Sequence, residues 1–257
     1  MNELLAQFGE RQVAGFLLVL GRVGPLLVLA PLFGFRMIPS RARLVIALAL
    51  AIGIAPVALG HAKIPTDTFA YVELMIKEIL VGFAFAYAIG AVLWALQMAG
   101  SLIDLFLGFS FGSLVDPLSG VNATVISNLY AMLGVGIFIA IGGDGFVIQG
   151  LAKTYDVIPL VDMPNLGSLV AGVDLAFVQL FRSALEVVAP VLIAVTITDV
   201  AFGVVSRVVP QLNVFAVGFP AKIAVGLVVL CASMPFLGGW FGEELNSSMR
   251  QFLGVLG

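Results

Sequence analysis

The sequence predicts an all-α, membrane-associated protein, and three observations support that fold class. Of the 257 residues, 61% are hydrophobic and only 11% are charged. Soluble domains contain about 45–50% apolar and about 25% charged residues. The apolar residues gather in six long segments, and no polar stretch between them is long enough to form a core of its own. We therefore expect a single domain of apolar helical hairpins over residues 1–257.

The six apolar segments have uneven lengths, which argues against a simple bundle of six spans. About 20 apolar residues cross a bilayer as a helix. The second segment is short for this, and the third and fifth are too long. Glycine and proline interrupt nearly all of them, and such residues bend or break helices. Bent or broken hairpins fit this pattern better. The segments are Gln12–Phe33, Leu44–Leu59, Phe69–Leu107, Val121–Ile141, Leu169–Val209 and Phe215–Phe236.

The stretch 106–120 lies between long apolar segments but predicts neither a regular helix nor a polar loop. Phe106, Phe109 and Phe111 lie among helix breakers, which are Gly108, Gly112, Pro117 and Gly120. Irregular backbone of this kind is tolerated at membrane depth only where protein buries it or where it lines a water-filled cavity. An ordinary connection between two hairpins is the alternative interpretation.

Several ionisable residues lie inside apolar segments, where a functional role is the first hypothesis. Asp199 has no basic residue one helical turn away, so it needs a tertiary partner, a partner subunit, water or a proton. Lys222 follows Pro220, which is expected in the first turn of the last helix. A lysine at the positive end of a helix is disfavoured. We therefore expect an acidic group or several carbonyl groups near Lys222.

Other intramembrane charges have simpler explanations. Arg22 and Asp104 stand alone in their segments and need partners from elsewhere in the structure. Two pairs have the i,i+4 spacing at which side chains on one helix meet. These pairs are Glu73 with Lys77, and Arg182 with Glu186.

The composition also excludes several classes of function. The net charge is −3, and the 12 lysines and arginines are scattered, so a nucleic-acid partner is not expected. The single cysteine, Cys231, excludes a disulfide within the chain, and we expect it to be a small buried apolar residue. No motif of a nucleotide site, a metal site or a catalytic nucleophile is present. We expect no cofactor, no metal and no enzymatic activity.

The segment 198–222 resembles the signature of the FliR family, the R-type subunits of the flagellar type III protein export gate. The family is related to the corresponding subunits of virulence injectisomes. Pro210-Gln-Leu-Asn-Val-Phe215, followed by Gly218, Pro220 and Lys222, is the most specific part. Pro31 to Arg43 near the start and Gly108 to Pro117 in the middle are also similar to the family. The resemblance extends over essentially the whole chain.

The resemblance implies a structural role in a channel at the bacterial inner membrane, within the flagellar basal body. Family members assemble with P-type and Q-type subunits into a helical hetero-oligomer of stacked hairpins, and they work with FlhB- and FlhA-type components. The channel passes unfolded flagellar proteins, and a loop of the R-type subunit plugs it. The matching stretch here implies these plug residues: Phe106, Gly108, Phe109, Ser110, Phe111, Gly112, Asp116 and Pro117.

Polar and aromatic residues of the C-terminal signature are interpreted as contacts to neighbouring subunits. They are Asp199, Arg207, Gln211, Asn213, Phe215 and Lys222. Two other functions stay open at this point. A secondary transporter would use Asp199 and Lys222 as substrate or coupling-ion groups in broken helices. An intramembrane enzyme would need a facing nucleophile and base, and the single histidine, His61, makes that interpretation weaker.

Overall fold

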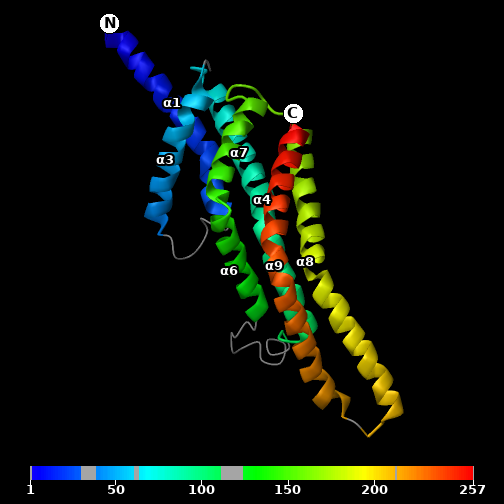
Figure 1. Ribbon diagram of the computed structural model, residues 1–257. Coiled ribbons are helices and arrows are strands. Elements are labelled where there is room, and N and C mark those ends of the chain that lie inside the picture. The colour runs from blue at the N-terminus through cyan, green and yellow to red at the C-terminus, as the bar shows by residue number, and fades with distance from the viewer. Residues whose placement is uncertain (1, 30–38, 61–63, 111–123, 212, 257) are drawn as a thin grey trace, which may run out of the picture. The chain divides into compact units, whose positions relative to one another are not determined.

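The computed structural model describes residues 2–29, 39–60, 64–110, 124–211 and 213–256, and these form seven helices. Five of the helices are long and apolar enough to cross a membrane, or six spans if one bent pair counts as a span. The predicted all-α, membrane-associated fold class is confirmed. The helices are α1 (Asn2–Leu29), α3 (Ser40–Leu59), α4 (Thr68–Leu107), α6 (Val125–Ala140), α7 (Gly143–Val157), α8 (Leu166–Val208) and α9 (Val214–Leu256) (Figure 1).

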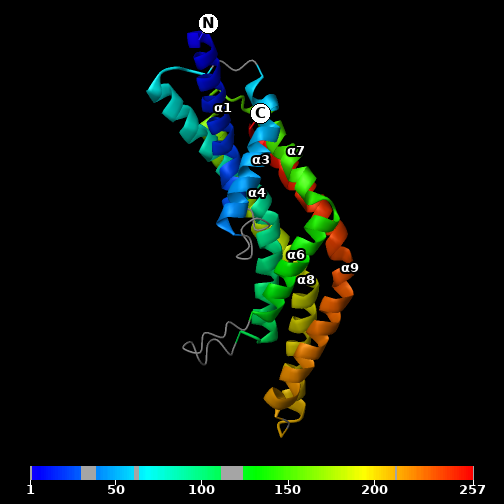
Figure 2. The same cartoon turned by 90° about the vertical axis from the view of Figure 1, so that its left-hand side faces the viewer.

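The chain forms two compact units. The first unit contains residues 1–91, 139–179 and 245–257, and the second contains residues 92–138 and 180–244. Helices α4, α6, α8 and α9 each contribute residues to both units. In the first unit, α1 and α3 pack side by side and α3 also contacts α7, and Figure 2 shows the α1–α3 hairpin.

Helix α4 supplies the core of both units. Its apolar residues lie on all sides of the helix, as expected for a buried helix, and 72% of its apolar stretch is buried. In the first unit its Phe85 ring packs edge-on against Phe252 of α9, with 6.1 Å between the ring centroids. Ser248 of α9 donates a hydrogen bond to the Ala88 carbonyl of α4 at 3.0 Å. These contacts fix α9 against α4 in the first unit.

A bent pair of helices is found at α6 and α7, with a bend of 75° at the short break between them, whereas the third and fifth apolar segments, which were expected to be broken, are continuous helices. Gly142 lies at this bend with a φ of 72°, in the left-handed region that glycine adopts readily. Helix α7 was missed by the search for apolar segments because it carries Asp144, Gln149 and Lys153 among its apolar residues.

The longest apolar segments owe their length to unbroken helices. Helix α4 has 40 residues, and α8 and α9 have 43 each. At about 1.5 Å per residue, 43 residues extend about 64 Å, which exceeds the bilayer hydrocarbon core of about 30 Å. The last helix begins at Val214, so the prediction that Pro220 lies in its first turn was wrong.

The prediction that Cys231 is buried was also wrong, because its side chain is exposed. It lies on a face of α9 that the rest of the second unit does not cover. An apolar sequence around a residue does not show whether the residue lies in the core or on a helix face that the rest of the chain leaves exposed. Only 17% of the residues in the apolar stretch of α9 are buried. Much of this helix is therefore uncovered, as Cys231 is.

Candidate functional site

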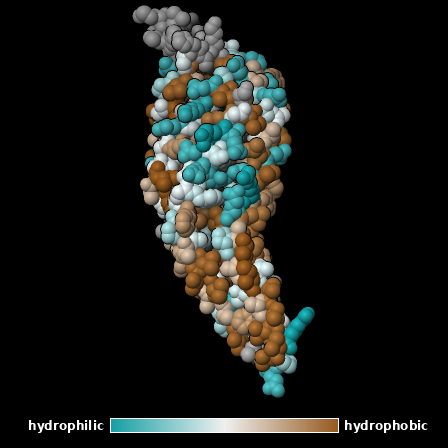
Figure 3. Space-filling view, turned by 45° about the vertical axis from the view of Figure 1, so that its right-hand side comes forward, coloured by the Kyte–Doolittle hydropathy of each residue, from teal (hydrophilic) through white to brown (hydrophobic). Residues whose placement is uncertain are grey.

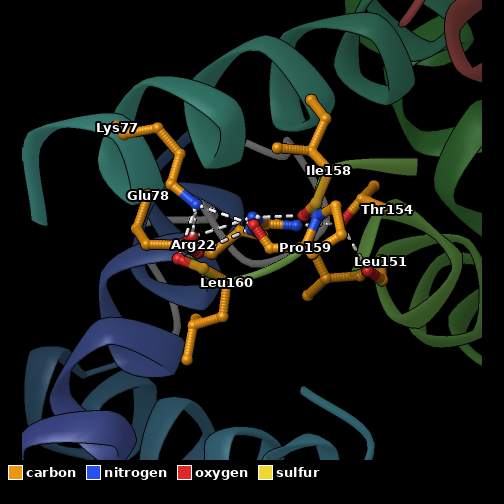
Figure 4. A network of polar contacts seen from close by, with 8 residues as sticks. All are labelled: Arg22, Lys77, Glu78, Leu151, Thr154, Ile158, Pro159 and Leu160. Atoms are coloured by element: carbon orange, nitrogen blue, oxygen red, sulfur yellow. Dashed lines mark hydrogen bonds and ion pairs between the residues drawn. The ribbon is translucent and has the colours of Figure 1, made fainter. Parts of the chain in front are cut away.

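A buried network of charged groups lies in the first unit and joins three helices (Figure 4). Arg22 of α1 forms a two-pronged ion pair with Glu78 of α4. Its Nε lies 2.6 Å from Glu78 Oε2, and its Nη2 lies 2.8 Å from Oε1. Arg22 also donates to Thr154 Oγ1 at 3.0 Å and to the Ile158 carbonyl at 3.0 Å. Tyr155 supports the guanidinium, with 3.8 Å between the Arg22 Cζ and the ring centroid.

Lys77 extends the same network. Its Nζ lies 2.6 Å from Glu78 Oε1 and donates to the carbonyls of Pro159 and Leu160 at 3.0 and 2.8 Å. Figure 4 shows these groups pointing toward one another from α1, α4 and the segment after α7. Arg22 and Glu78 are 0% exposed and Lys77 is 4% exposed.

The network brings the side chains of an arginine and a lysine to a single carboxylate, that of Glu78. Three consecutive carbonyls, from Ile158 to Leu160, accept hydrogen bonds from the cations. They directly follow the C-terminus of α7, and a cation is favoured at the negative end of a helix. The network therefore fixes the end of α7 to α1 and α4.

Sequence reasoning found one part of this network and missed the other. Arg22 was expected to need a distant partner, and that prediction is confirmed. The predicted pairing of Lys77 with Glu73 was wrong, because the Lys77 ammonium pairs with Glu78. Neighbours in sequence do not face each other on a helix, so the pattern drew attention away from Glu78. The long Lys77 side chain can still contact the adjacent Glu78 because both side chains are buried in the same part of the first unit.

The second unit contains the start of the predicted plug. Helix α4 ends at Leu107, and Gly108 follows with a φ of 85°. The Gly108 N–H donates to the Leu105 carbonyl at 3.2 Å, and the Ser110 N–H donates to the Asp104 carbonyl at 3.4 Å. Side chains of Phe106 and Phe109 are half-buried. The predicted helix break is confirmed at Gly108. Phe111, Gly112, Asp116 and Pro117 lie outside the described residues.

Asp104 connects the two helices that flank this stretch in the second unit. It is 0% exposed, and its carboxylate accepts hydrogen bonds from the N–H groups of Ile126 at 3.0 Å and Ser127 at 2.9 Å. These groups belong to the first turn of α6, where free N–H groups and the helix dipole favour an anion. The expectation that Asp104 has a distant partner is confirmed.

The contact between α4 and α6 is close. A Cβ on Gly100 would lie 2.6 Å from the Ser127 Cα, so only glycine allows this approach. Ser101 Oγ donates to Ser127 Oγ at 2.9 Å, and Ser127 Oγ lies 3.1 Å from the Gln97 carbonyl. The end of α4 and the start of α6 are therefore held together on both sides of residues 108–124.

Replacing Asp104 with alanine is expected to loosen the first turn of α6. The variant leaves two buried N–H groups without their acceptor, which costs about 1–3 kcal/mol per unsatisfied group. Amide hydrogen exchange at Ile126 and Ser127 in the purified protein measures the effect. Ser101→Ala is the matched control, because it removes a neighbouring hydroxyl and leaves the carboxylate in place. Unchanged exchange at both amides in Asp104→Ala would contradict the assigned contact.

Asp199 and Lys222 form an ion pair across the α8–α9 hairpin in the second unit, with 2.7 Å between Asp199 Oδ2 and Lys222 Nζ. The prediction of an acidic group near Lys222 is confirmed. The side chain of Asp199 is 54% exposed and that of Lys222 is 20% exposed. The pair is thus made within the chain, and the carboxylate still presents a free surface.

The remaining residues of the C-terminal signature surround the turn between α8 and α9. Arg207 is exposed in the last turn of α8, and Gln211 is exposed in the turn itself. Asn213 caps α9, with its Oδ1 accepting from the Ala216 N–H at 3.1 Å. Phe215 lies in the first turn of α9, and its side chain is not among the side chains that the structure describes.

The predicted ion pair between Arg182 and Glu186 on α8 is confirmed, with 2.9 Å between Arg182 Nε and Glu186 Oε1.

Comparison with known proteins places these features in a family. A sequence model described as "Bacterial export proteins, family 1" matches residues 13–248. The chain belongs to this family. The match includes both compact units, the buried charge network and the C-terminal signature. The resemblance to the FliR family is confirmed as well, and the chain is an integral membrane component of bacterial protein export.

Individual relatives have two different names, FliR and SpaR. The flagellar biosynthetic protein FliR of Bacillus subtilis (strain 168) is 32% identical over 242 residues, which cover 92% of this chain and 91% of that protein. FliR of Escherichia coli (strain K12) is 29% identical over 232 residues, covering 90% and 88%. The surface presentation of antigens protein SpaR of Shigella flexneri is 27% identical over 216 residues, covering 82% of each chain.

Proposed function

We propose that this chain is the structural, channel-forming R-type subunit of a flagellar type III export gate. The observation that carries the proposal is the family match over residues 13–248, together with flagellar relatives that cover about nine tenths of the chain. The subunit acts in the bacterial inner membrane, within the flagellar basal body. It passes unfolded flagellar proteins and has no enzymatic role.

The uncovered apolar surface supports assembly with other subunits. The apolar windows of α8 and α9 are only 22% and 17% buried, so most of their surface awaits a neighbour. Large exposed apolar patches mark sites of protein or membrane interaction. P-type and Q-type subunits fill this role in the proposal, and FlhB- and FlhA-type components complete the apparatus.

The stretch 106–120 closes the channel in this proposal. Apolar side chains seal a pore because they exclude water and ions from a constriction. Phe106 and Phe109 begin the stretch, and Gly108 ends the helix that carries it. The Asp104 contact to α6 supplies a fixed base. A stretch held at its base can be displaced by cargo while α4 and α6 keep their contact.

Deleting Gly108–Ser113 tests the plug directly. We expect ion leakage through the assembled gate to rise, because the apolar seal is lost while the Asp104 contact and the hairpins remain. Conductance of gates in planar bilayers, or ion flux in cells that carry the gate, measures the effect. Phe109→Ala provides a milder variant. Unchanged leakage in a fully assembled gate would count against the plug.

A further inference from the structure

Polar side chains gather on one face of α4 in the second unit. The non-aromatic polar residues of its stretch 92–107 are Gln97, Ser101 and Asp104, and their spacing of four and three residues places them on one face of the helix. Gln97 and Ser101 are exposed, and Asp104 is buried. Elsewhere the second unit exposes many apolar side chains, which Figure 3 shows gathered on α8 and α9 near the turn that joins them.

A third exposed polar side chain lies next to these residues at the start of α6. Ser101 Oγ donates to Ser127 Oγ at 2.9 Å, and Ser127 Oγ donates to the Gln97 carbonyl at 3.1 Å. The first turn of α6 therefore lies against Gln97 and Ser101. Asn128 follows Ser127 directly and is exposed. The three exposed residues, Gln97, Ser101 and Asn128, are here called the α4–α6 polar patch.

We infer that the α4–α6 polar patch lines the water-filled path of the exported polypeptide and forms hydrogen bonds with the polypeptide backbone. The inference rests on the proposed function, to which it adds a defined surface and the chemistry that contacts the cargo. Polar side chains in membrane segments face protein or water and avoid hydrocarbon. Lipid is therefore a poor neighbour for the patch, which leaves another subunit or an aqueous channel.

The position of the patch favours the channel. Asp104 lies one turn after Ser101 and fixes the start of α6 through two hydrogen bonds. Two residues later begins the stretch 106–120, which closes the channel in the proposed function. Gln97 precedes Phe106 by only about 14 Å of helix. The patch therefore continues the surface of α4 and α6 from which this stretch departs.

The chemistry of the patch fits an unfolded polypeptide of any sequence. Each residue of an extended chain, proline excepted, offers one N–H and one C=O group, and amide and hydroxyl side chains donate and accept hydrogen bonds. A charged surface would retain segments of opposite charge and repel segments of like charge. Within 92–107 and 125–138 the only charged residue is Asp104, and its carboxylate is buried against the N–H groups of Ile126 and Ser127. The patch is therefore neutral.

Thiol labelling of the assembled gate tests whether the patch faces water. Gln97→Cys and Asn128→Cys are made singly in a Cys231→Ser background, in a gate opened by the Gly108–Ser113 deletion. The probe is a methanethiosulfonate that carries a trimethylammonium group. We expect both cysteines to react at least about tenfold faster than Val228→Cys on α9, because the reactive thiolate forms in water and is disfavoured in apolar surroundings. Val228 is the control because it is apolar and 69% exposed in the chain alone.

Photocrosslinking identifies what the patch contacts. Benzoylphenylalanine in place of Gln97 is expected to crosslink to an export substrate that a folded domain stalls in the gate, and the crosslink is expected to disappear when no substrate is present. The same group in place of Val228 is expected to give no crosslink to the substrate. Recovery of P-type and Q-type subunits with the affinity-tagged chain checks that each variant assembles.

Two results would overturn the inference and leave the proposed function in place. One is labelling of Gln97→Cys and Asn128→Cys no faster than that of Val228→Cys in a gate that leaks ions. The other is a crosslink from position 97 to another subunit, and none to the stalled substrate. A wild-type chain that recovers no other subunit would overturn the proposed function itself.

Discussion

Replacing Glu78 with alanine is expected to destabilise the first unit by about 3–5 kcal/mol, which is the usual cost of removing one partner from a buried ion pair. Arg22 and Lys77 would then remain buried without the carboxylate that both of them contact. Both cations are almost completely excluded from solvent, so water cannot replace the lost carboxylate. Thermal unfolding of the purified chain in mild detergent, followed by circular dichroism, measures the change.

Two control variants show whether a loss of stability comes from the buried charge network or from a change in helix α4 itself. Glu73→Ala removes an exposed carboxylate five residues earlier on the same helix, and its unfolding temperature is expected to match the wild type. Arg22→Met combined with Glu78→Met removes both charges of the two-pronged pair. This double variant leaves only Lys77 buried without its carboxylate partner, whereas Glu78→Ala leaves both Arg22 and Lys77, so the double variant is expected to be more stable than Glu78→Ala. A Glu78→Ala protein as stable as the wild type would show that the cations do not depend on Glu78.

Charge reversal at Lys222 is expected to prevent recovery of the complex with P-type and Q-type subunits. Lys222→Glu places a second carboxylate beside Asp199, where 2.7 Å now separates opposite charges. The hairpin loses its ion pair, and the surface offered to neighbouring subunits changes sign. Co-purification with an affinity-tagged chain measures the effect, and recovery is expected to fall at least tenfold.

A charge swap distinguishes loss of the ion pair within the hairpin from the changed charge on the surface. Asp199→Lys combined with Lys222→Glu restores an ion pair within the hairpin but reverses the charge that the half-exposed position 199 presents. If Asp199 contacts a partner subunit, the swapped chain folds normally but recovers the complex poorly. Full recovery by the swapped chain would limit the pair to a role inside the hairpin and would remove Asp199 and Lys222 from the proposed subunit contacts.

The fold class and the existence of partners for lone charges were predictable from the sequence, because both follow from the cost of placing charge in apolar surroundings. Arg22, Asp104 and Lys222 were each expected to have a partner, and each has one. The identity of the partners was not predictable. Arg22 and Glu78 are 56 residues apart, and Asp104 binds backbone N–H groups that carry no sequence signal.

Helix ends and exposed helix faces were harder to predict because hydropathy alone does not define them. The last helix begins six residues before Pro220, and α7 contains enough polar residues to fall outside the predicted apolar segments. Cys231 was expected inside the chain but lies on an exposed face. Hydropathy reports that a side chain avoids water, and it does not report whether the same chain or a neighbour covers it. The subunit contacts and the plug of the candidate site therefore remain predictions.

The buried network of the first unit also has a consequence for biosynthesis. During synthesis Arg22 is made 56 residues before Glu78. Its other partners come later still, Thr154 after 132 residues and Ile158 after 136 residues. An arginine at the centre of an apolar helix opposes insertion by about 2.5–3.5 kcal/mol. The unmatched charge therefore opposes membrane insertion of the first helix, which favours delaying its final position until α4 has been synthesised. Lys77 arrives together with Glu78, so the second cation enters already paired.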